Sequence, residues 1–163
     1  MSARAARASV DAYLARLRRA VSCVTRAVLL GVPEPNDHTW LATLATPPAP
    51  LSASPALALV LAYAFRSESP AESTTWTTTP VSYRYALLAT NESEILAYHW
   101  HPTGSSPIVA PHLHISARHP NRDLSKSHLP TGIVSPAAFI RALITEFGVE
   151  PLRADWDTIL DEA

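Results

Sequence analysis

The sequence predicts an α+β fold in which an N-terminal helix and C-terminal helices pack on a four-stranded antiparallel sheet. Three observations predict it. A long amphipathic segment opens the chain, four strand-like segments joined mostly by short turns occupy its middle, and a capped helical segment lies near its end. Because strands joined by short turns pair antiparallel, the middle of the chain is expected to form a meander. We expect a single domain over residues 1–163.

The first predicted element is a helix over residues 8–30. Its apolar residues recur at alternating spacings of three and four, which places them on one helix face. They are Val10, Leu14, Leu17, Val21, Val24 and Val28. We expect this face to cover the sheet. The alternatives are a surface for a partner helix or a removable targeting peptide, because the segment is rich in arginine and alanine.

The segment after this helix is expected to be irregular. Gly31 and the prolines that follow it end the helix, and residues 31–55 carry six prolines. These residues are therefore predicted to form a connector, with a short element at Trp40–Leu44. Residues 56–65 are then apolar without interruption, which predicts a central strand buried on both faces.

The other three strands of the predicted sheet, which spans residues 56–117, follow at short intervals. Residues 79–89 alternate in polarity and lead into the turn 90–93. Residues 94–101 then return as the second strand of a hairpin, and residues 108–117 supply the fourth strand.

A basic loop at residues 118–134 is expected to separate the sheet from C-terminal helices within residues 135–163. Ser135 suits the N-cap position of the first of these helices, and Pro136 suits its first turn. Gly148 is placed to end it. A second, shorter helix is expected to begin near residue 152.

Charge and composition exclude several classes of function. The formal net charge of −1 excludes a uniformly basic protein that coats nucleic acid. The single cysteine, Cys23, excludes an intramolecular disulfide framework and a thiolate zinc cage. No apolar run is long enough to cross a bilayer, so we expect a cytoplasmic protein. The N-terminal 30 residues are basic and residues 135–163 are acidic, so the two ends can attract each other or a partner.

Histidine placement is the strongest feature of the sequence. Six of the seven histidines lie between His99 and His128. Four of them form two H-x-H pairs, His99 with His101 and His112 with His114. Residues two apart on a strand point to the same face, and neighbouring strands bring facing residues together. The two pairs therefore predict up to four imidazoles on one patch of the sheet.

Three interpretations of this patch stay open. The four imidazoles are possible ligands for zinc or another divalent transition metal in a metal-dependent hydrolase. Without a metal, two imidazoles can act as general acid and base in RNA cleavage through the 2′-hydroxyl. In the third interpretation the patch is a solvated polar face of the sheet, and the protein is a non-enzymatic interaction module that pairs through its basic N-terminal helix and its acidic C-terminal helix. The cations expected to hold an RNA phosphate are Arg84, Arg118, Arg122 and Lys126.

Four short motifs lie between residues 80 and 147. They are Tyr83-Arg84-Tyr85-Ala86-Leu87, Leu96-Ala97-Tyr98-His99, Pro111-His112-Leu113-His114 and His128-Leu129-Pro130. In these motifs the chain resembles small bacterial toxins of the TumE-like type. The Pro-His-His-x-His element of that family is reduced here to residues 111–114.

The resemblance implies a compact ribonuclease fold, RNA cleavage and a cognate antitoxin as protein partner. It carries a catalytic role to His112 and His114, and adds Tyr85 and His128 as further candidates. Together with His99 from the predicted patch, these residues make the leading expectation a metal-independent endoribonuclease of toxin–antitoxin type. No cofactor is needed for that chemistry, and the possible partners include a second copy of the chain in a homodimer.

Overall fold

The computed structural model describes residues 3–35, 38–52, 56–69, 76–103, 107–116, 118–119, 122–123 and 127–163. The helices are α1 (Ala3–Val21), α2 (Pro136–Thr145) and α3 (Trp156–Asp161). The strands are β1 (Leu29–Pro33), β2 (Thr39–Leu44), β3 (Ala49–Pro50), β4 (Leu57–Glu68), β5 (Thr77–Ala89), β6 (Glu94–Trp100), β7 (His112–Ile115), β8 (Arg118–His119), β9 (Arg122–Asp123) and β10 (Leu129–Pro130).

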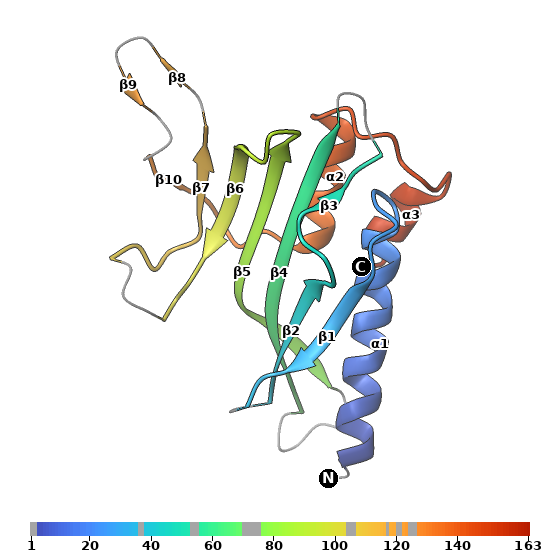
Figure 1. Ribbon diagram of the computed structural model, residues 1–163. Helices are drawn as coiled ribbons and strands as arrows, with labels where there is room; N and C mark the ends of the chain where they lie inside the picture. The colour runs from blue at the N-terminus through green and yellow to red at the C-terminus, as the bar shows by residue number, and fades with distance from the viewer. Residues whose placement is uncertain are drawn as a thin grey trace.

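One antiparallel sheet dominates the molecule (Figure 1). Its strands run in the order β1-β2-β4-β5-β6-β7-β10, and β3 pairs with β4 beside this path. β8 and β9 form a separate two-stranded ribbon. The expectation of an α+β fold with an antiparallel sheet is confirmed, but the main sheet has eight strands and not four.

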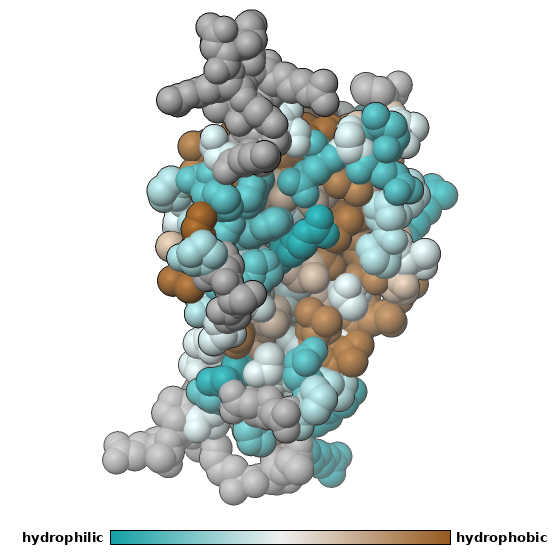
Figure 2. Space-filling view, turned by 60° about the vertical axis from the view of Figure 1, so that its left-hand side comes forward, coloured by the Kyte–Doolittle hydropathy of each residue, from teal (hydrophilic) through white to brown (hydrophobic). Residues whose placement is uncertain are grey.

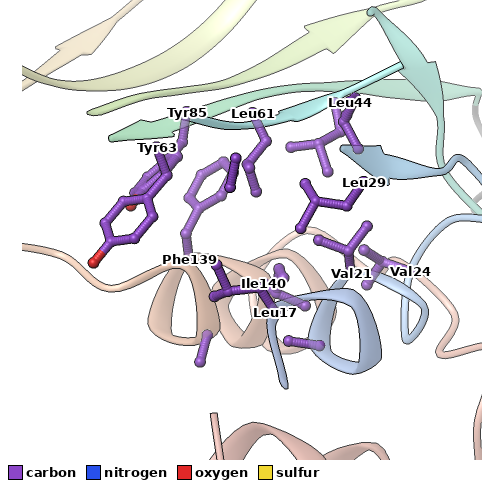
Figure 3. Close-up of a cluster of buried hydrophobic side chains, with 14 of the residues drawn as sticks. Leu17, Val21, Val24, Leu29, Leu44, Leu61, Tyr63, Tyr85, Phe139 and Ile140 are labelled. Atoms are coloured by element: carbon purple, nitrogen blue, oxygen red, sulfur yellow. The ribbon is translucent and has the colours of Figure 1, made fainter. Parts of the chain in front are cut away.

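The hydrophobic core lies between one face of this sheet and the helices. Side chains of α1, α2 and α3 join alternate residues of β1, β2, β4, β5 and β6 in one buried cluster. Figure 3 shows Leu17 and Val21 of α1 beside Phe139 and Ile140 of α2, all directed toward Leu61 and Leu44 of the sheet. No helix of the described residues covers the opposite face, which we call the open face.

The segment expected to be a connector, residues 31–55, contains more strand than predicted: the short element expected at Trp40–Leu44 is β2, and β3 and the end of β1 add to it. Strand β2 lies inside the sheet between β1 and β4. The prolines do not prevent this, because Pro33 and Pro50 stand at strand ends and Pro47 and Pro48 lie between β2 and β3. Strand ends tolerate a residue without an amide hydrogen.

The N-terminal helix is also shifted from its predicted bounds of 8–30. It begins at Ala3 and ends at Val21. The spacing of apolar residues continues beyond this end because Val24 is also buried, although it lies in the turn after the helix. Thr25 stabilises the turn that follows the helix. Its hydroxyl accepts a hydrogen bond from the Ala27 amide and donates one to the Pro50 carbonyl, so the side chain stabilises a turn in place of another helical turn.

Strand β4 is buried on one face only, which corrects the prediction for residues 56–65. Leu59, Leu61 and Phe65 face the helices and are buried, whereas Val60 and Ala62 lie half-buried on the open face. The sequence of this strand is apolar without interruption because its residues on the open face are apolar too, and this made the strand look buried on both faces.

The predicted hairpin of β5 and β6 is confirmed, with Arg84 opposite His99. The fourth predicted strand, residues 108–117, is reduced to β7 because pairing with β6 extends only over His112–Ile115. The expected loop at residues 118–134 contains the short strands β8, β9 and β10.

The C-terminal segment begins as predicted. The Ser135 side chain accepts a hydrogen bond from the Ala138 amide at 3.1 Å, proline occupies the first turn of α2, and Gly148 adopts a positive φ of 66° after the helix. The last helix begins at Trp156, four residues later than expected. Across the described ranges, no helix combines the length and the apolar character needed to cross a membrane.

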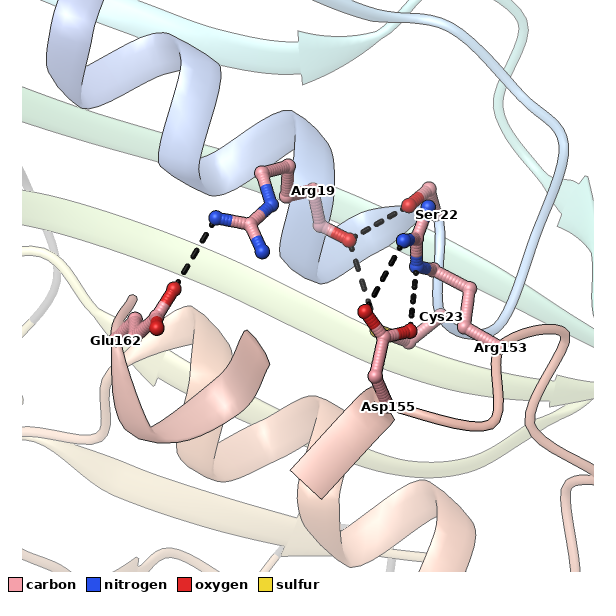
Figure 4. A network of polar contacts seen from close by, with 6 residues as sticks. All are labelled: Arg19, Ser22, Cys23, Arg153, Asp155 and Glu162. Carbon is pink, nitrogen blue, oxygen red and sulfur yellow. Dashed lines mark hydrogen bonds and ion pairs between the residues drawn. The ribbon is translucent and has the colours of Figure 1, made fainter. Parts of the chain in front are cut away.

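The basic and acidic ends of the chain meet in the same molecule. An ion pair of 3.1 Å joins Arg19 of α1 to Glu162 just after α3, and Arg153 pairs with Asp155 nearby (Figure 4). The predicted attraction between the two ends is therefore present within one chain.

Candidate functional site

The histidines gather on the open face because of strand alternation and register. In β6, Tyr98 contributes to the core, so His99 points away from the helices. In β7, Leu113 packs toward the core, so His112 and His114 take the other face. Antiparallel pairing sets His99 directly opposite His112 and Ala97 opposite His114. Figure 2 shows hydrophilic side chains gathered beside a hydrophobic area on one side of the molecule.

Five imidazoles form one connected group in which each ring lies next to at least one other, and we call them the histidine cluster: His99, His101, His112, His114 and His128. The ring centroids of His99 and His114 are 4.8 Å apart, those of His112 and His114 are 5.0 Å apart, and those of His99 and His112 are 5.6 Å apart. His101 lies 5.6 Å from His99. The predicted patch of four imidazoles is therefore confirmed.

His128 is the fifth member of the histidine cluster and comes from the segment before β10. Its ring centroid lies 4.4 Å from that of His114 and 5.0 Å from that of His112. Pairing of β10 with β7 brings it there, because Pro130 lies opposite His112. The side chain of His128 is exposed.

His112 is the most firmly held of these rings. Its side chain is buried, and its Nδ1 lies 2.8 Å from the carbonyl oxygen of Ala110. A carbonyl only accepts hydrogen bonds, so Nδ1 carries the proton. In the neutral ring, Nε2 then presents a lone pair.

His99 is held in its neutral form. Burial lowers the pKa of its imidazole to about 4, and the nearby positive charges of His114, Arg84, His101 and His112 add to the effect. Its Nε2 is buried and has no hydrogen-bond partner within the described part of the chain. A buried polar atom of this kind is costly unless something binds it.

Three rings have the spacing of metal ligands. A ligand atom from each of His99, His112 and His114 can be chosen so that all lie within 4.8 Å of one another. A tetrahedral ion with metal–nitrogen bonds of about 2.0–2.1 Å places its imidazole centroids about 5 Å apart. The observed centroid separations of 4.8–5.6 Å bracket that value.

Arg84 supplies a positive charge next to the histidine cluster. It stands opposite His99 on β5 and shares the open face. Its guanidinium lies 3.4 Å from a carboxylate oxygen of Glu94, a residue that the sequence reasoning did not single out. A bulge between Leu87 and Leu88 shifts the register near Glu94, so simple alternation along the hairpin does not reveal this contact.

The structure does not describe the side chains of the other three predicted cations. Arg118 and Arg122 belong to the β8–β9 ribbon, but their side chains lie outside the described residues, as does the whole of Lys126.

The assignment of Tyr85 to the site is wrong. Tyr85 is completely buried on the helix-covered face, opposite in direction to Arg84. Its ring stacks on Tyr83 at 4.7 Å and on Phe139 of α2 at 5.3 Å. The two tyrosines are therefore core residues.

Comparison with known proteins adds no functional assignment, since the chain matches no family model, no curated protein and no solved structure. The chemistry of the histidine cluster is therefore inferred from its geometry.

Proposed function

We propose that the histidine cluster binds a divalent transition-metal ion such as zinc, and that the protein is a metal-dependent hydrolase of phosphate esters. The observation that carries this proposal is the convergence of His99, His112 and His114, whose ligand atoms lie within 4.8 Å of one another on the open face. Three imidazoles are a common ligand set of catalytic zinc, which keeps a further position for water or substrate.

The surroundings of these rings support a metal centre. Metal-bound histidines usually donate their second ring nitrogen to a carbonyl or carboxylate, which orients the ring. His112 makes this contact with Ala110. His99 offers an unpartnered nitrogen on a neutral ring, which is the form that binds metals.

The chemistry is divided between the ion and the chain. When bound, the ion supplies Lewis-acid activation of water. His128, exposed and in contact with His114, is in position to accept or return a proton. Arg84 binds the anionic group of the substrate, because a guanidinium presents two parallel donors to phosphate oxygens. Glu94 holds that guanidinium through a single long contact, so most of its donors stay available.

A second candidate function is the metal-independent RNA cleavage that the toxin resemblance implies, restrained by a cognate antitoxin. The specific observation in its favour is the contact between His114 and His128, whose ring centroids are 4.4 Å apart. Two adjacent imidazoles can serve as acid and base for attack by the 2′-hydroxyl, with Arg84 stabilising the phosphorane.

Metal binding is tested first. Untagged protein, stripped with chelator and titrated with Co²⁺ or Zn²⁺ in a calorimeter, should bind close to one ion per chain. His99→Ala and His114→Ala should each weaken binding at least tenfold. The matched control is His38→Asn, because His38 lies outside the histidine cluster at a φ of 54°, where asparagine is tolerated better than alanine. Absence of stoichiometric binding, or an equal loss in the control, would rule out the metal centre.

Activity then separates the candidates. Metal-loaded protein should hydrolyse bis(4-nitrophenyl) phosphate, and removal of the metal should abolish the reaction. Cleavage of RNA by chelator-treated protein, lost in His114→Ala, would instead favour the second candidate. A protein that binds no metal and cleaves neither substrate would favour the non-enzymatic interaction module.

A further inference from the structure

A pocket of about 590 Å³ lies among three loops and shares no residue with the histidine cluster. We call it the loop pocket. It is formed by the turn after α1, the segment around β3 and the loop before α3. Its apolar lining consists of Ala27, Pro48, Pro50, Leu51 and Leu152. Pockets that hold small molecules have volumes of roughly 300–1,000 Å³ and mostly apolar walls.

The walls of the loop pocket are fixed to one another by hydrogen bonds. The Leu152 amide donates to the Cys23 carbonyl at 2.7 Å, and the Glu150 amide donates to the Ser52 carbonyl at 2.8 Å. The Thr25 hydroxyl donates to the Pro50 carbonyl at 2.7 Å. These contacts join all three loops, so the pocket is preformed and little ordering is needed when a ligand enters.

One charged group lines the loop pocket. The side chain of Arg26 is exposed and has no hydrogen bond or ion pair with any of the described residues. The hydroxyls of Thr25 and Ser52, in contrast, already bond to main-chain carbonyls of the walls. Arg26 is therefore the charged group of the lining with donors available for a ligand, and the exposed Thr46 hydroxyl adds one neutral donor.

We propose that the loop pocket binds a small molecule with an apolar body and one carboxylate group. The body fills the space between the prolines and leucines, and the carboxylate pairs with Arg26. A single guanidinium matches a single carboxylate through two parallel hydrogen bonds. Arg26 is the one charged residue among the described residues of the lining, so the pocket balances the single charge of a carboxylate and leaves the second charge of a phosphate dianion unpaired. The proposal is independent of the function of the histidine cluster.

The test is a titration of the isotope-labelled full chain with 4-phenylbutanoate and its neutral amide, followed by amide chemical shifts. Saturable shifts should be confined to residues 25–27, 46–52 and 152, and the carboxylate should bind about tenfold more tightly than the amide. Arg26→Gln should remove this preference without changing amide binding. The matched control is Arg16→Gln, since Arg16 is an exposed arginine of α1 that lies over the Tyr13 ring.

Variants that fill the loop pocket complete the test. Ala27→Phe and Thr46→Phe introduce bulk from two different walls and should abolish binding of both probes, with folding checked by thermal unfolding. Thr46 is exposed, so its replacement leaves the core intact. The proposal is overturned by equal affinity for acid and amide, by a preference that survives Arg26→Gln, or by shifts located at other residues.

Discussion

His112 differs from the rest of the histidine cluster because its side chain is part of the packed structure. Only 5% of its surface is exposed, and its Nδ1–H bonds to the Ala110 carbonyl. His128, by comparison, is exposed. The two ring centroids lie 5.0 Å apart, so both can take part in the same site. Their contributions to the stability of the protein should nevertheless differ, because only His112 is buried.

This difference in burial predicts how strongly an alanine substitution at each histidine lowers the free energy of unfolding. His112→Ala leaves a carbonyl without its donor and a small void, and should lower the free energy of unfolding by about 1–3 kcal/mol. His128→Ala should change it by less than about 0.5 kcal/mol, as is usual for a surface substitution. Urea unfolding of the metal-free variants measures both values. Equal losses in the two variants would show that His112 is not held as described.

The sequence was informative about which residues share a face and less so about their roles. Alternation with period two was sufficient to group His99 with His101 and His112 with His114. The same alternation separates Tyr85 from Arg84, and the site role for Tyr85 came from the family resemblance alone. His128 lies 14 residues beyond His114 in the sequence, and no local pattern could fix its position, which depends on the pairing of β10 with β7.

At the scale of elements, α1 and β1 approach each other closely at one glycine. A Cβ placed on Gly31 would lie 2.2 Å from a methyl carbon of Leu14. Leu14 is itself 2% exposed and belongs to the core cluster, so a shift of its side chain would have to displace other core residues. Glycine at this position therefore allows the helix to sit directly on the edge strand.

Replacement of Gly31 by a residue with a side chain should reveal the close contact with Leu14. Gly31→Ala is expected to destabilise the protein by about 1–3 kcal/mol through overpacking. In a Leu14→Ala background the same change should cost much less, because the clashing methyl group is gone. A double-mutant cycle from urea unfolding gives the coupling energy. Additive effects of the two substitutions would contradict the close approach.

Element boundaries were harder to predict than element types. The apolar stripe of the N-terminal helix passes through its real end because Val24 remains buried in the turn. Prolines obscured β3, whereas β2, which contains no proline, was expected as a short element one residue shorter than the strand observed. The cap at Ser135 was predicted correctly because a single side-chain hydrogen bond determines it locally. Non-local pairing, by contrast, decides where a strand such as β7 stops.

For the molecule as a whole, charge at the two ends of the chain is partly neutralised internally. Arg19 pairs with Glu162 across α1 and α3, and Arg141 of α2 pairs with Asp157 and Asp161 of α3. Exposed pairs of this kind contribute little to stability, typically about 0–1 kcal/mol each. Their effect is to reduce the basic and acidic surface that a partner protein would use.

A chain of tyrosines runs through the core beneath the sheet. The Tyr83 and Tyr85 rings are stacked, the Tyr63 and Tyr85 rings are 6.5 Å apart, and the Tyr13 hydroxyl donates a hydrogen bond to that of Tyr63 at 3.1 Å. Burial raises the pKa of all four phenols above the ordinary value of 10. The effect is largest for Tyr63 and Tyr85.

These phenols predict loss of stability in alkali. Above pH 10 the unfolded chain releases phenolic protons that the folded core retains, so stability falls as pH rises from that point. Tyr63 and Tyr85 should each contribute about 1.4 kcal/mol of loss per pH unit. Urea unfolding at pH 8, 10 and 11, with phenolate absorbance at 295 nm, should show ionisation coupled to unfolding. Tyr63→Phe combined with Tyr85→Phe should flatten this dependence. An unchanged slope in the double variant, or a phenolate signal that forms before unfolding and is lost in the double variant, would show that these hydroxyls are accessible in the folded protein.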